Sequence, residues 1–456
     1  MSFSPSGHHM SVSATAVACA TILSSTACSG AQGDRSHRPP HTVNVLMVDN
    51  PQMLDLERLT ATYFTKATGI KVNFTVLPED HLRDEGNKDF SRQSGRYDVA
   101  SLSNYEVPIY AKAGWLAPLT GYAADDRSFD QNDILAPMEE SLTVSRQVYA
   151  EPFYGESSFL MYRKDLLAAK NLAMPAHPTW AQVASMAARL DGAAPGMKGI
   201  CLRGQPGWGE VIAPLTTVVN TFGGTWFAAD WNAELTSDPF KQATRFYVDL
   251  VRQHGEAKAA QAGYSECLND MEHGRTAMWY DSTAAAGTLE QSDSPVKGDI
   301  GYAPAPVEDT TDSGWIYTWA WAVEKASQRR DDAWKFISWA SSKGYENLVG
   351  NTLGWSRVPA GKRGSTYRNS QYAQVAAAFA NATLNAINTV NPDFAGIQPR
   401  PTTGVQFVDI PEFSGLGDEV SQRISAAIAG RMSVDDALQQ SQELAERIST
   451  KYTGSG

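Results

Sequence analysis

The sequence predicts an α/β protein built from two lobes, with a ligand cleft between them. Its 456 residues and 42% apolar content are enough to bury more than one core. Strand and helix patterns alternate from residue 42 and again from residue 179, which is typical of α/β layers. Between these regions, residues 148–163 (VYAEPFYGESSFLMYR) are almost uncharged and aromatic, as expected of extended, buried chain. We interpret this stretch as a segment that crosses between the lobes and lines the cleft.

The first lobe begins with a strand, a turn and a helix. Residues 42–48 (TVNVLMV) form the predicted strand, and Asn50 can cap a helix whose first position is Pro51. Apolar residues then fall on one helical face until Gly69, which can end the helix in a left-handed conformation. This unit sets the pattern for the rest of the lobe.

Two more strands place polar loops at one edge of the predicted sheet. Residues 72–76 alternate as a strand does, and residues 97–102 form a third candidate. Ligands of such α/β layers contact the loops beyond the strand ends. Asp49 and Asn50 occupy one of these loops, and Asn104-Tyr105-Glu106 occupies another.

Glu156 is the most informative residue of the crossing segment. A carboxylate in apolar extended chain is costly unless it is paired or hydrogen-bonded. We therefore expect Glu156 to point into a cavity; a satisfied structural acid is the alternative. Glu151 lies in the same segment and has the same cost.

The α/β layer of the second lobe begins at a capping box formed by Thr179 and Gln182. A short strand at residues 199–203 leads into the Gly-rich loop GQPGWGE, which carries Trp208 and Glu210. This loop lacks the spacing and the Lys-Ser/Thr pair of a phosphate loop.

A helix opened by Pro239 and a strand at residues 276–281 (TAMWYD) continue this lobe. The run WIYTWAW at residues 315–321 predicts a second crossing segment. Alternation on a strand would place Trp315, Tyr317, Trp319 and Trp321 on one side as a flat aromatic surface, whereas buried filler is the other reading.

The remaining chain predicts helices at residues 331–340 and 371–388, and two helices within 416–451, the second restarting at Ser433. The chain thus runs from the first lobe to the second, back to the first, and again to the second. The predicted boundaries are 42–151 and 323–390 for the first lobe, and 152–322 and 391–456 for the second, hinge segments included. Lobes joined by several segments can close by hinge motion.

The first 27 residues carry no Lys, Arg, Asp or Glu and include a short apolar run. This pattern is typical of a signal peptide and is too short to span a membrane. Ser25-Thr26-Ala27-Cys28 resembles the lipobox of bacterial lipoproteins, which predicts lipidation of Cys28 and a tether over residues 28–41; an ordinary cleaved signal peptide is the alternative. The expected location is the extracellular face of the cell membrane.

Composition and spacing exclude several classes of chemistry. The net charge of −12 and the lack of a basic cluster argue against a nucleic-acid partner. His and Cys residues lack metal-ligand spacing, no G-x-S-x-G elbow occurs, and no cofactor is expected. Cys201 and Cys267 can form a disulfide in an oxidising compartment, but the sequence leaves this open.

Acidic residues beside tryptophans favour a carbohydrate-type ligand. Trp208 is close in sequence to Glu210, and Trp279 to Asp281. Aromatic faces pack against C–H surfaces, while carboxylates and arginine hydrogen-bond hydroxyl groups. A glycoside hydrolase uses the same residue types, with Glu156 and either Asp281 or Glu210 as its carboxylate pair. Sequence spacing does not separate these readings.

The motifs together resemble the extracellular solute-binding proteins of ABC importers, in particular the sorbitol- and mannitol-type polyol-binding members of the maltose-binding-like group. The resemblance covers residues 42–451. It rests on NYEVPIYAKAGWLAPL from Asn104, EPFYGESSFLMYRKDL from Glu151, GICLRGQPGWGE from Gly199, FGGTWF from Phe222, GVQFVDIPEFSGLG from Gly404 and MSVDDAL from Met432.

This resemblance implies a periplasmic-binding-protein-like fold, no catalysis, and capture of a sugar alcohol of the sorbitol, mannitol, xylitol or arabitol type for import through ABC permease subunits. A mono- or disaccharide is the alternative ligand. It also implies a monomer, attached to the membrane only through its lipid. The implied ligand contacts are Tyr105, Glu106, Tyr154, Glu156, Arg203, Trp208, Glu210, Trp279, Asp281, Trp319, Trp355 and Gln406.

Overall fold

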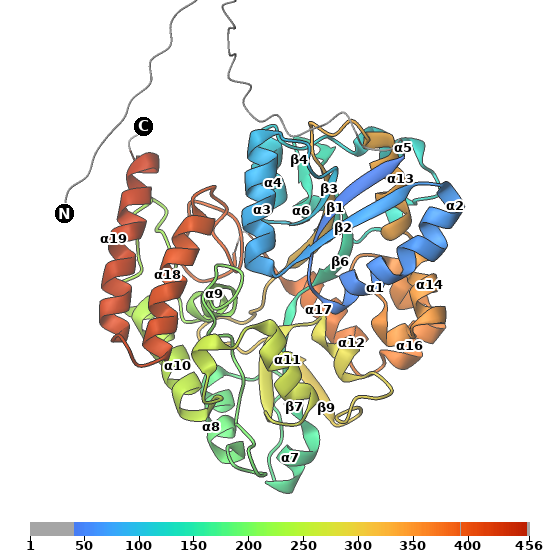
Figure 1. The fold of residues 1–456 in the computed structure, drawn as a ribbon. Helices are drawn as coiled ribbons and strands as arrows, with labels where there is room; N and C mark the ends of the chain where they lie inside the picture. Colours follow the sequence, from blue (N-terminus) through green and yellow to red (C-terminus); the bar gives the residue numbers. More distant parts are fainter. Residues whose placement is uncertain (1–40, 393, 454–456) are drawn as a thin grey trace, which may run out of the picture. The chain divides into compact units, whose positions relative to one another are not determined.

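A computed structural model of the protein describes residues 41–392 and 394–453, which belong to one compact unit over residues 38–456 (Figure 1). The predicted signal peptide, residues 1–27, and the predicted lipidation site, Cys28, lie outside the described residues. So does nearly all of the predicted tether.

The larger of two main sheets has five strands in the order β2-β1-β3-β10-β6. Strands β1 (Thr42–Val48), β2 (Lys71–Leu77) and β3 (Val99–Ser103) run parallel. Strand β10 (Tyr317–Val323) returns from far along the chain and pairs antiparallel with both β3 and β6 (Ala150–Glu156). The loops after β1 and β2, the end of β6 and the start of β10 therefore converge on one region.

The first helix starts where the sequence predicts. Asn50 accepts a hydrogen bond from the Met53 backbone N–H at 3.0 Å, and Pro51 takes the first helical position. The helix runs from α1 (Pro51–Leu59) through a π-helical turn to α2 (Lys66–Thr68) and ends at Gly69 with φ 75°. The other helices that accompany the larger sheet are α3 (Glu79–Arg92), α4 (Glu106–Lys112), α5 (Thr120–Asp125), α6 (Ala136–Ser141), α13 (Arg330–Ala340), α14 (Lys343–Thr352), α15 (Gly364–Arg368) and α16 (Ser370–Val375).

The second lobe contains a three-stranded antiparallel sheet in the order β8-β7-β9. Its strands are β7 (Ser158–Arg163), β8 (Met278–Ser282) and β9 (Ile300–Pro304). Two short strands elsewhere, β4 (Thr143–Val144) and β5 (Gln147–Val148), form a hairpin. The helices of this lobe are α7 (Lys164–Ala169), α8 (Trp180–Leu190), α9 (Ile212–Thr221), α10 (Asp238–His254), α11 (Tyr264–Glu272), α12 (Ala285–Leu289), α17 (Ala380–Thr389), α18 (Phe413–Ile428) and α19 (Val434–Thr453).

Several local predictions are confirmed in this lobe. Thr179 and Gln182 form both hydrogen bonds of the capping box at the start of α8. Ser433 accepts from the Asp436 N–H at 3.0 Å and restarts the last helix. Cys201 and Cys267 are joined by a disulfide, so the question left open by the sequence is answered.

Two element predictions are wrong. Residues 199–203 form a single isolated bridge, between Cys201 and Trp279, and not the continuous pairing of a strand. The single helix expected over residues 371–388 is interrupted at residues 376–379. Helix α16 packs near the 3-10 turn Trp355–Arg357, whereas α17 packs on β7 and β9, so the chain changes lobes at the interruption.

Strand pairing also bears on the predicted lobe boundaries. Residues 150–156 pair with β10 along almost their whole length, and Ser157 separates β6 from β7. The pairing therefore favours a first lobe that includes all of β6 and β10 and excludes α17. The chain crosses between the lobes at Ser157, before β10 and at residues 376–379.

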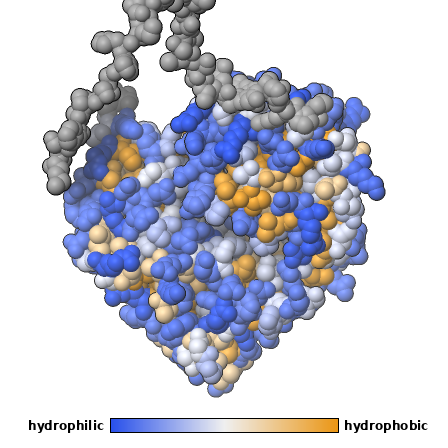
Figure 2. Space-filling view, viewed as in Figure 1, coloured by the Kyte–Doolittle hydropathy of each residue, from blue (hydrophilic) through white to orange (hydrophobic). Residues whose placement is uncertain are grey.

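Hydrophilic residues cover most of the face drawn in Figure 2, with apolar residues gathered over β2 and α1. Leu54 and Tyr63 are the exposed large apolar side chains of that region. Among the described helices, none combines the length and the apolar character that a membrane crossing requires.

Candidate functional site

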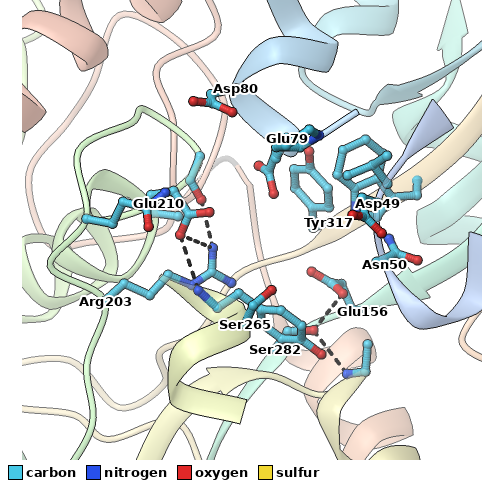
Figure 3. Close-up of a pocket in the computed structure, with 18 of the residues that line it drawn as sticks. Asp49, Asn50, Glu79, Asp80, Glu156, Arg203, Glu210, Ser265, Ser282 and Tyr317 are labelled. Carbon is cyan, nitrogen blue, oxygen red and sulfur yellow. Dashed lines mark hydrogen bonds and ion pairs between the residues drawn. The ribbon is translucent and has the colours of Figure 1, made fainter. Parts of the chain in front are cut away.

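A cavity of about 300 Å³ lies where the two lobes meet. Its volume is at the lower end of the roughly 300–1,000 Å³ that small-molecule sites occupy. The first lobe contributes the loops after β1 and β2 and the facing residues of β6 and β10, and the second lobe contributes the Arg203 segment, the start of α11 and the end of β8 (Figure 3). This arrangement suits a ligand that touches both lobes at once.

The two parallel strand ends supply the polar groups of the first lobe. Asn50 caps α1 with its carbonyl oxygen and donates from its amide nitrogen to the Tyr154 hydroxyl at 3.0 Å. Helix α3 begins directly after Pro78, which places Glu79 and Asp80 in its first turn and at the cavity. Acidic residues in a first turn are favoured by the helix dipole.

Glu156 is 8% exposed and faces the cavity from the end of β6. One of its carboxylate oxygens accepts from the Ser282 hydroxyl at 2.6 Å, and Ser282 stands at the end of β8 in the other lobe. Burial raises the pKa of Glu156 to about 8, although the Ser282 hydrogen bond and Arg203 oppose this shift. Glu156 therefore lines a cavity, as its place in an apolar extended segment predicts.

Arg203 is held rigidly by a carboxylate behind the cavity wall. Its Nε and one terminal nitrogen donate to the two oxygens of Asp281 at 2.8 and 2.6 Å. The other terminal nitrogen donates to the Gly209 carbonyl at 2.9 Å. Asp281 is fully buried and also accepts from the Trp279 indole N–H at 3.1 Å. Asp281 and Trp279 thus position the guanidinium that lines the cavity.

Glu210 completes the polar wall of the second lobe. One of its oxygens lies 3.5 Å from Arg203 and accepts from the Tyr264 backbone N–H at 3.3 Å, at the start of α11. Burial raises the pKa of Glu210 to about 8 despite the nearby Arg203, and the charge of Glu79 adds to the rise. Glu79 likewise raises the pKa of Glu156, so the three carboxylates share one electrostatic environment.

Aromatic faces form the apolar part of the lining. Trp315, Tyr317 and Trp319 reach the cavity from the second crossing segment, as the alternation of WIYTWAW predicts. Trp321 lies deeper and packs on Phe153 and Phe336 in the core of the first lobe. Three of the four residues of the predicted aromatic surface therefore line the cavity, and the fourth belongs to the core.

Six of the twelve residues predicted as ligand contacts line the cavity: Tyr154, Glu156, Arg203, Glu210, Trp319 and Gln406. The other six lie outside the lining: Tyr105, Glu106, Trp208, Trp279, Asp281 and Trp355. As described above, Asp281 and Trp279 support Arg203 from behind.

Tyr105, Glu106 and Trp208 belong to a contact between the lobes beside the cavity. The Trp208 ring packs on Tyr105 with centroids 4.8 Å apart, and the Arg83 guanidinium lies 3.7 Å from its centroid. Glu106 accepts from Arg83 at 3.1 Å and from the Ser103 N–H and hydroxyl. Trp355 instead fills the space beside Gly350. These side chains pack within the protein, and none of them lines the cavity.

Sequence reasoning missed several lining residues, among them Glu79, Asp80, Tyr264, Ser265 and Ser282. Glu79 and Asp80 follow the second strand, so the rule that ligands meet strand ends could have found them. The serines and Tyr264 carry no comparable signal, because they reach the cavity only through the packing of α11 and β8.

Among the described residues, the single group of possible metal ligands is Cys201, Glu256 and Asp270, none of which lines the cavity. The sulfur of Cys201 is committed to its disulfide, so this group is not a convincing metal site.

The fold and the site define a two-lobed solute-binding protein. The chain matches the family model described as bacterial extracellular solute-binding protein over residues 50–347, and it belongs to that family. The family resemblance inferred from the motifs is confirmed, as are the predicted α/β class and two-lobed fold.

Three relatives illustrate the similarity. The chain is 37% identical to the mannitol-binding protein of Pseudomonas aeruginosa over 409 residues, which cover 89% of this chain and 92% of the relative. It is 39% identical to the crystal structure of an ABC transporter solute-binding protein from Agrobacterium vitis S4 with bound D-mannitol, with a TM-score of 0.88 over 90% of this chain and 99% of that one. A ribitol complex from Agrobacterium radiobacter K84, at 21% identity, has a TM-score of 0.79 over 90% of this chain and 99% of that one, which shows the shared fold.

Proposed function

We propose that this chain is the substrate-binding component of an ABC importer that captures a linear sugar alcohol. The observation that carries the proposal is the small cavity between the lobes, in which carboxylates and Arg203 alternate with aromatic faces. Hydroxyl groups donate to carboxylates and accept from a guanidinium, while the C–H surface of a polyol packs against aromatic rings. Similarity to the mannitol-binding protein and to the D-mannitol complex supports this ligand class.

Capture follows from the division of the site between the lobes. Glu156 and the strand-end loops belong to the first lobe, and Arg203 and Glu210 to the second. A ligand that bonds to both sides binds the closed arrangement better than an open one, and its differential affinity shifts the population toward closure. No bond-breaking step is needed.

The position of Asp281 argues against one of the two carboxylate pairs that a glycoside hydrolase could use here, Glu156 with Asp281. Asp281 is fully buried, and both of its oxygens are engaged by Arg203, so it cannot also act as nucleophile or base on a substrate. A disaccharide has roughly twice as many heavy atoms as a hexitol, and a cavity of about 300 Å³ favours the smaller ligand.

The proposal extends to location and partners. We infer export by the segment 1–27, lipidation at Cys28, and action as a monomer outside the membrane with ABC permease subunits. Radiolabelled palmitate incorporation that disappears in Cys28→Ser would support the lipid anchor. Equal incorporation by the variant would contradict it.

Thermal unfolding with candidate ligands tests the ligand class. A ligand present at about 100 times its Kd stabilises the folded protein by roughly 2.7 kcal/mol, which raises the unfolding midpoint. We expect the midpoint to rise with hexitols or pentitols and to stay constant with disaccharides. A rise with disaccharides alone would reject the polyol assignment and leave a two-lobed receptor for a larger sugar.

A further inference from the structure

We propose that the same cavity also accepts a positively charged polyol, an alditol in which one terminal hydroxyl is replaced by a protonated amine, and that it excludes the corresponding sugar acid. The inference rests on the proposed function, because the ligand occupies the same site. It concerns the charge of the ligand, which the similarity to polyol-binding relatives does not address.

The charges that line the cavity are strongly unequal. Arg203 is the one cationic side chain among the described lining residues, whereas the acidic ones are Asp49, Glu79, Asp80, Glu156, Glu210 and Glu266. Outside the lining, Arg83 is paired with Glu106 and also with the lining residue Glu79, and Arg203 is paired with the buried Asp281. Each of these two cations is already matched by at least one carboxylate, so the remaining acids facing the cavity are in excess.

Arg203 is poorly available to an anionic ligand. Asp281 occupies two of its donors in a bidentate pair, and the Gly209 carbonyl occupies a third. Glu210 lies 3.5 Å away on the same side. A carboxylate at this point would have to compete with these partners and approach Glu210 and Glu156 as well. An anion here would keep Glu210 and Glu156 protonated, whereas a cation would favour their charged forms, so the two ligand charges act on this wall in opposite directions.

Glu156 provides the specific contact for an ammonium group. It is 8% exposed, and only one of its two oxygens accepts a hydrogen bond from a described residue, the Ser282 hydroxyl. The other oxygen is free to accept from a ligand. Burial raises the pKa of Glu156 to about 8, which reflects the cost of its charge in the empty cavity. A ligand cation would offset that cost.

The aromatic lining favours a cation as well. Tyr154, Trp315, Tyr317 and Trp319 line the cavity together with Glu156. The negative face of an aromatic ring attracts a cation by about 0.5–2 kcal/mol, depending on how well water is excluded. A primary alkylammonium resembles the Lys side chain, whose pKa is about 10.4, and therefore stays charged at neutral pH.

Calorimetry with three ligands of one skeleton tests the proposal. The purified protein is titrated at pH 7.5 with D-mannitol, 1-amino-1-deoxy-D-mannitol and D-mannonate, which differ only at one end. We expect the amine to bind at least as tightly as mannitol, and mannonate to bind at least tenfold more weakly than the amine, corresponding to about 1.4 kcal/mol.

Glu156→Gln tests the assigned contact because it removes the charge and keeps the side-chain shape. We expect this variant to lose at least tenfold in affinity for the amine and clearly less for mannitol. The matched control is Glu419→Gln, an exposed acid of α18 that does not line the cavity, which should leave the ratio of the two affinities unchanged. Unfolding midpoints of both variants establish that they fold.

The outcomes separate this inference from the proposed function. If mannitol binds but the amine binds more than tenfold more weakly than mannitol, the inference is overturned and polyol capture stands. The same follows if mannonate binds as tightly as the amine. Amine binding that is indifferent to Glu156→Gln would overturn the role of Glu156. Failure of mannitol and of the other hexitols and pentitols would reject the proposed function, while amine binding in preference to mannonate would still support the charge selectivity.

Discussion

Arg203 depends on a residue that no ligand would touch. The fully buried Asp281 receives two hydrogen bonds from the guanidinium, one from Trp279 and one from the Ser282 backbone N–H at 2.7 Å. A planar guanidinium matches a carboxylate in this bidentate way, and the compact ammonium of lysine does not. The buried Asp281 therefore fixes the orientation of the Arg203 guanidinium at the cavity.

Arg203→Lys is expected to weaken both ligand binding and folding, although it keeps the charge. Loss of the bidentate pair leaves Asp281 partly unpaired in a buried environment, and breaking such pairs costs about 3–5 kcal/mol. Calorimetry and denaturant unfolding would measure the two effects. A lysine variant with normal affinity and stability would show that the paired geometry is unimportant.

Glu151 illustrates a buried acid outside the cavity. It is fully buried, and neither carboxylate oxygen has a hydrogen-bond partner among the described residues. Burial raises the pKa of Glu151 to about 8; Glu139 adds to the rise, while Gln131 and Arg363 oppose it. The folded protein therefore holds a proton on this group where the unfolded chain, with a pKa near 4.5, releases it.

The sign of the pH effect follows from these two pKa values. Between about pH 4.5 and 8 the folded state binds more protons at Glu151, so its contribution to stability falls as pH rises through this window. We expect Glu151→Gln to raise the unfolding midpoint relative to the native protein at pH 8.5, and the difference to shrink at pH 4.5. A difference that is constant with pH would show that Glu151 does not titrate in this range.

At the scale of elements, the disulfide between Cys201 and Cys267 joins two walls of the cavity. Cys201 lies two residues before Arg203, and Cys267 lies in the first turns of α11, beside Tyr264 and Ser265. The bridge spans 66 positions of sequence and has a Cα–Cα distance of 5.6 Å. It ties segments that no regular strand pairing holds together.

Removing this bridge should cost stability and affinity together. Loss of a native disulfide typically costs about 2–5 kcal/mol. The double variant Cys201→Ala/Cys267→Ala is expected to unfold at a lower temperature and to bind polyol more weakly, since Arg203 and α11 become less restrained. Equal affinity in native and double-variant protein would mean that the packing around β8 alone holds these walls.

At the scale of the whole molecule, the contact of Trp208 with Arg83 and Tyr105 links the lobes beside the cavity. The Tyr105 hydroxyl donates to the Ile410 carbonyl at 2.8 Å and so reinforces the same contact. None of these side chains lines the cavity. Their interactions stabilise the arrangement of lobes that encloses the ligand, which couples them to affinity through closure.

Trp208→Leu should therefore weaken ligand binding without removing a ligand contact. A desolvated cation–π interaction contributes about 2 kcal/mol, so its loss predicts a roughly thirtyfold higher Kd if all of it acts on closure. Small-angle scattering of the ligand-free variant should show a larger radius of gyration than that of the native protein.

Trp180→Leu is the matched control for this prediction. Trp180 is buried within the second lobe against Phe246 and Tyr280. Trp180→Leu should lower the unfolding midpoint while changing the Kd for the ligand by less than about threefold. Similar affinity losses in both variants would attribute the effect to general destabilisation.

The sequence by itself determined the class of fold, the positions of most elements and the lobe-crossing nature of two segments. Caps at Asn50 and Thr179 and the alternation of apolar residues are local signals, and local interactions set where helices and strands begin. Glu156 could be selected because a charge in apolar chain requires a special environment. The motifs added the family, which the match over residues 50–347 confirms.

Only the tertiary structure decided which side chains line the cavity and which support it. Trp208, Trp279 and Asp281 lie close in sequence to true lining residues, and sequence proximity does not distinguish the front of a wall from its back. Ser282 contacts Glu156, and Ser265 lines the cavity, because strands and helices from distant parts of the chain pack together. Side-chain direction depends on such long-range packing, and no local pattern encodes it.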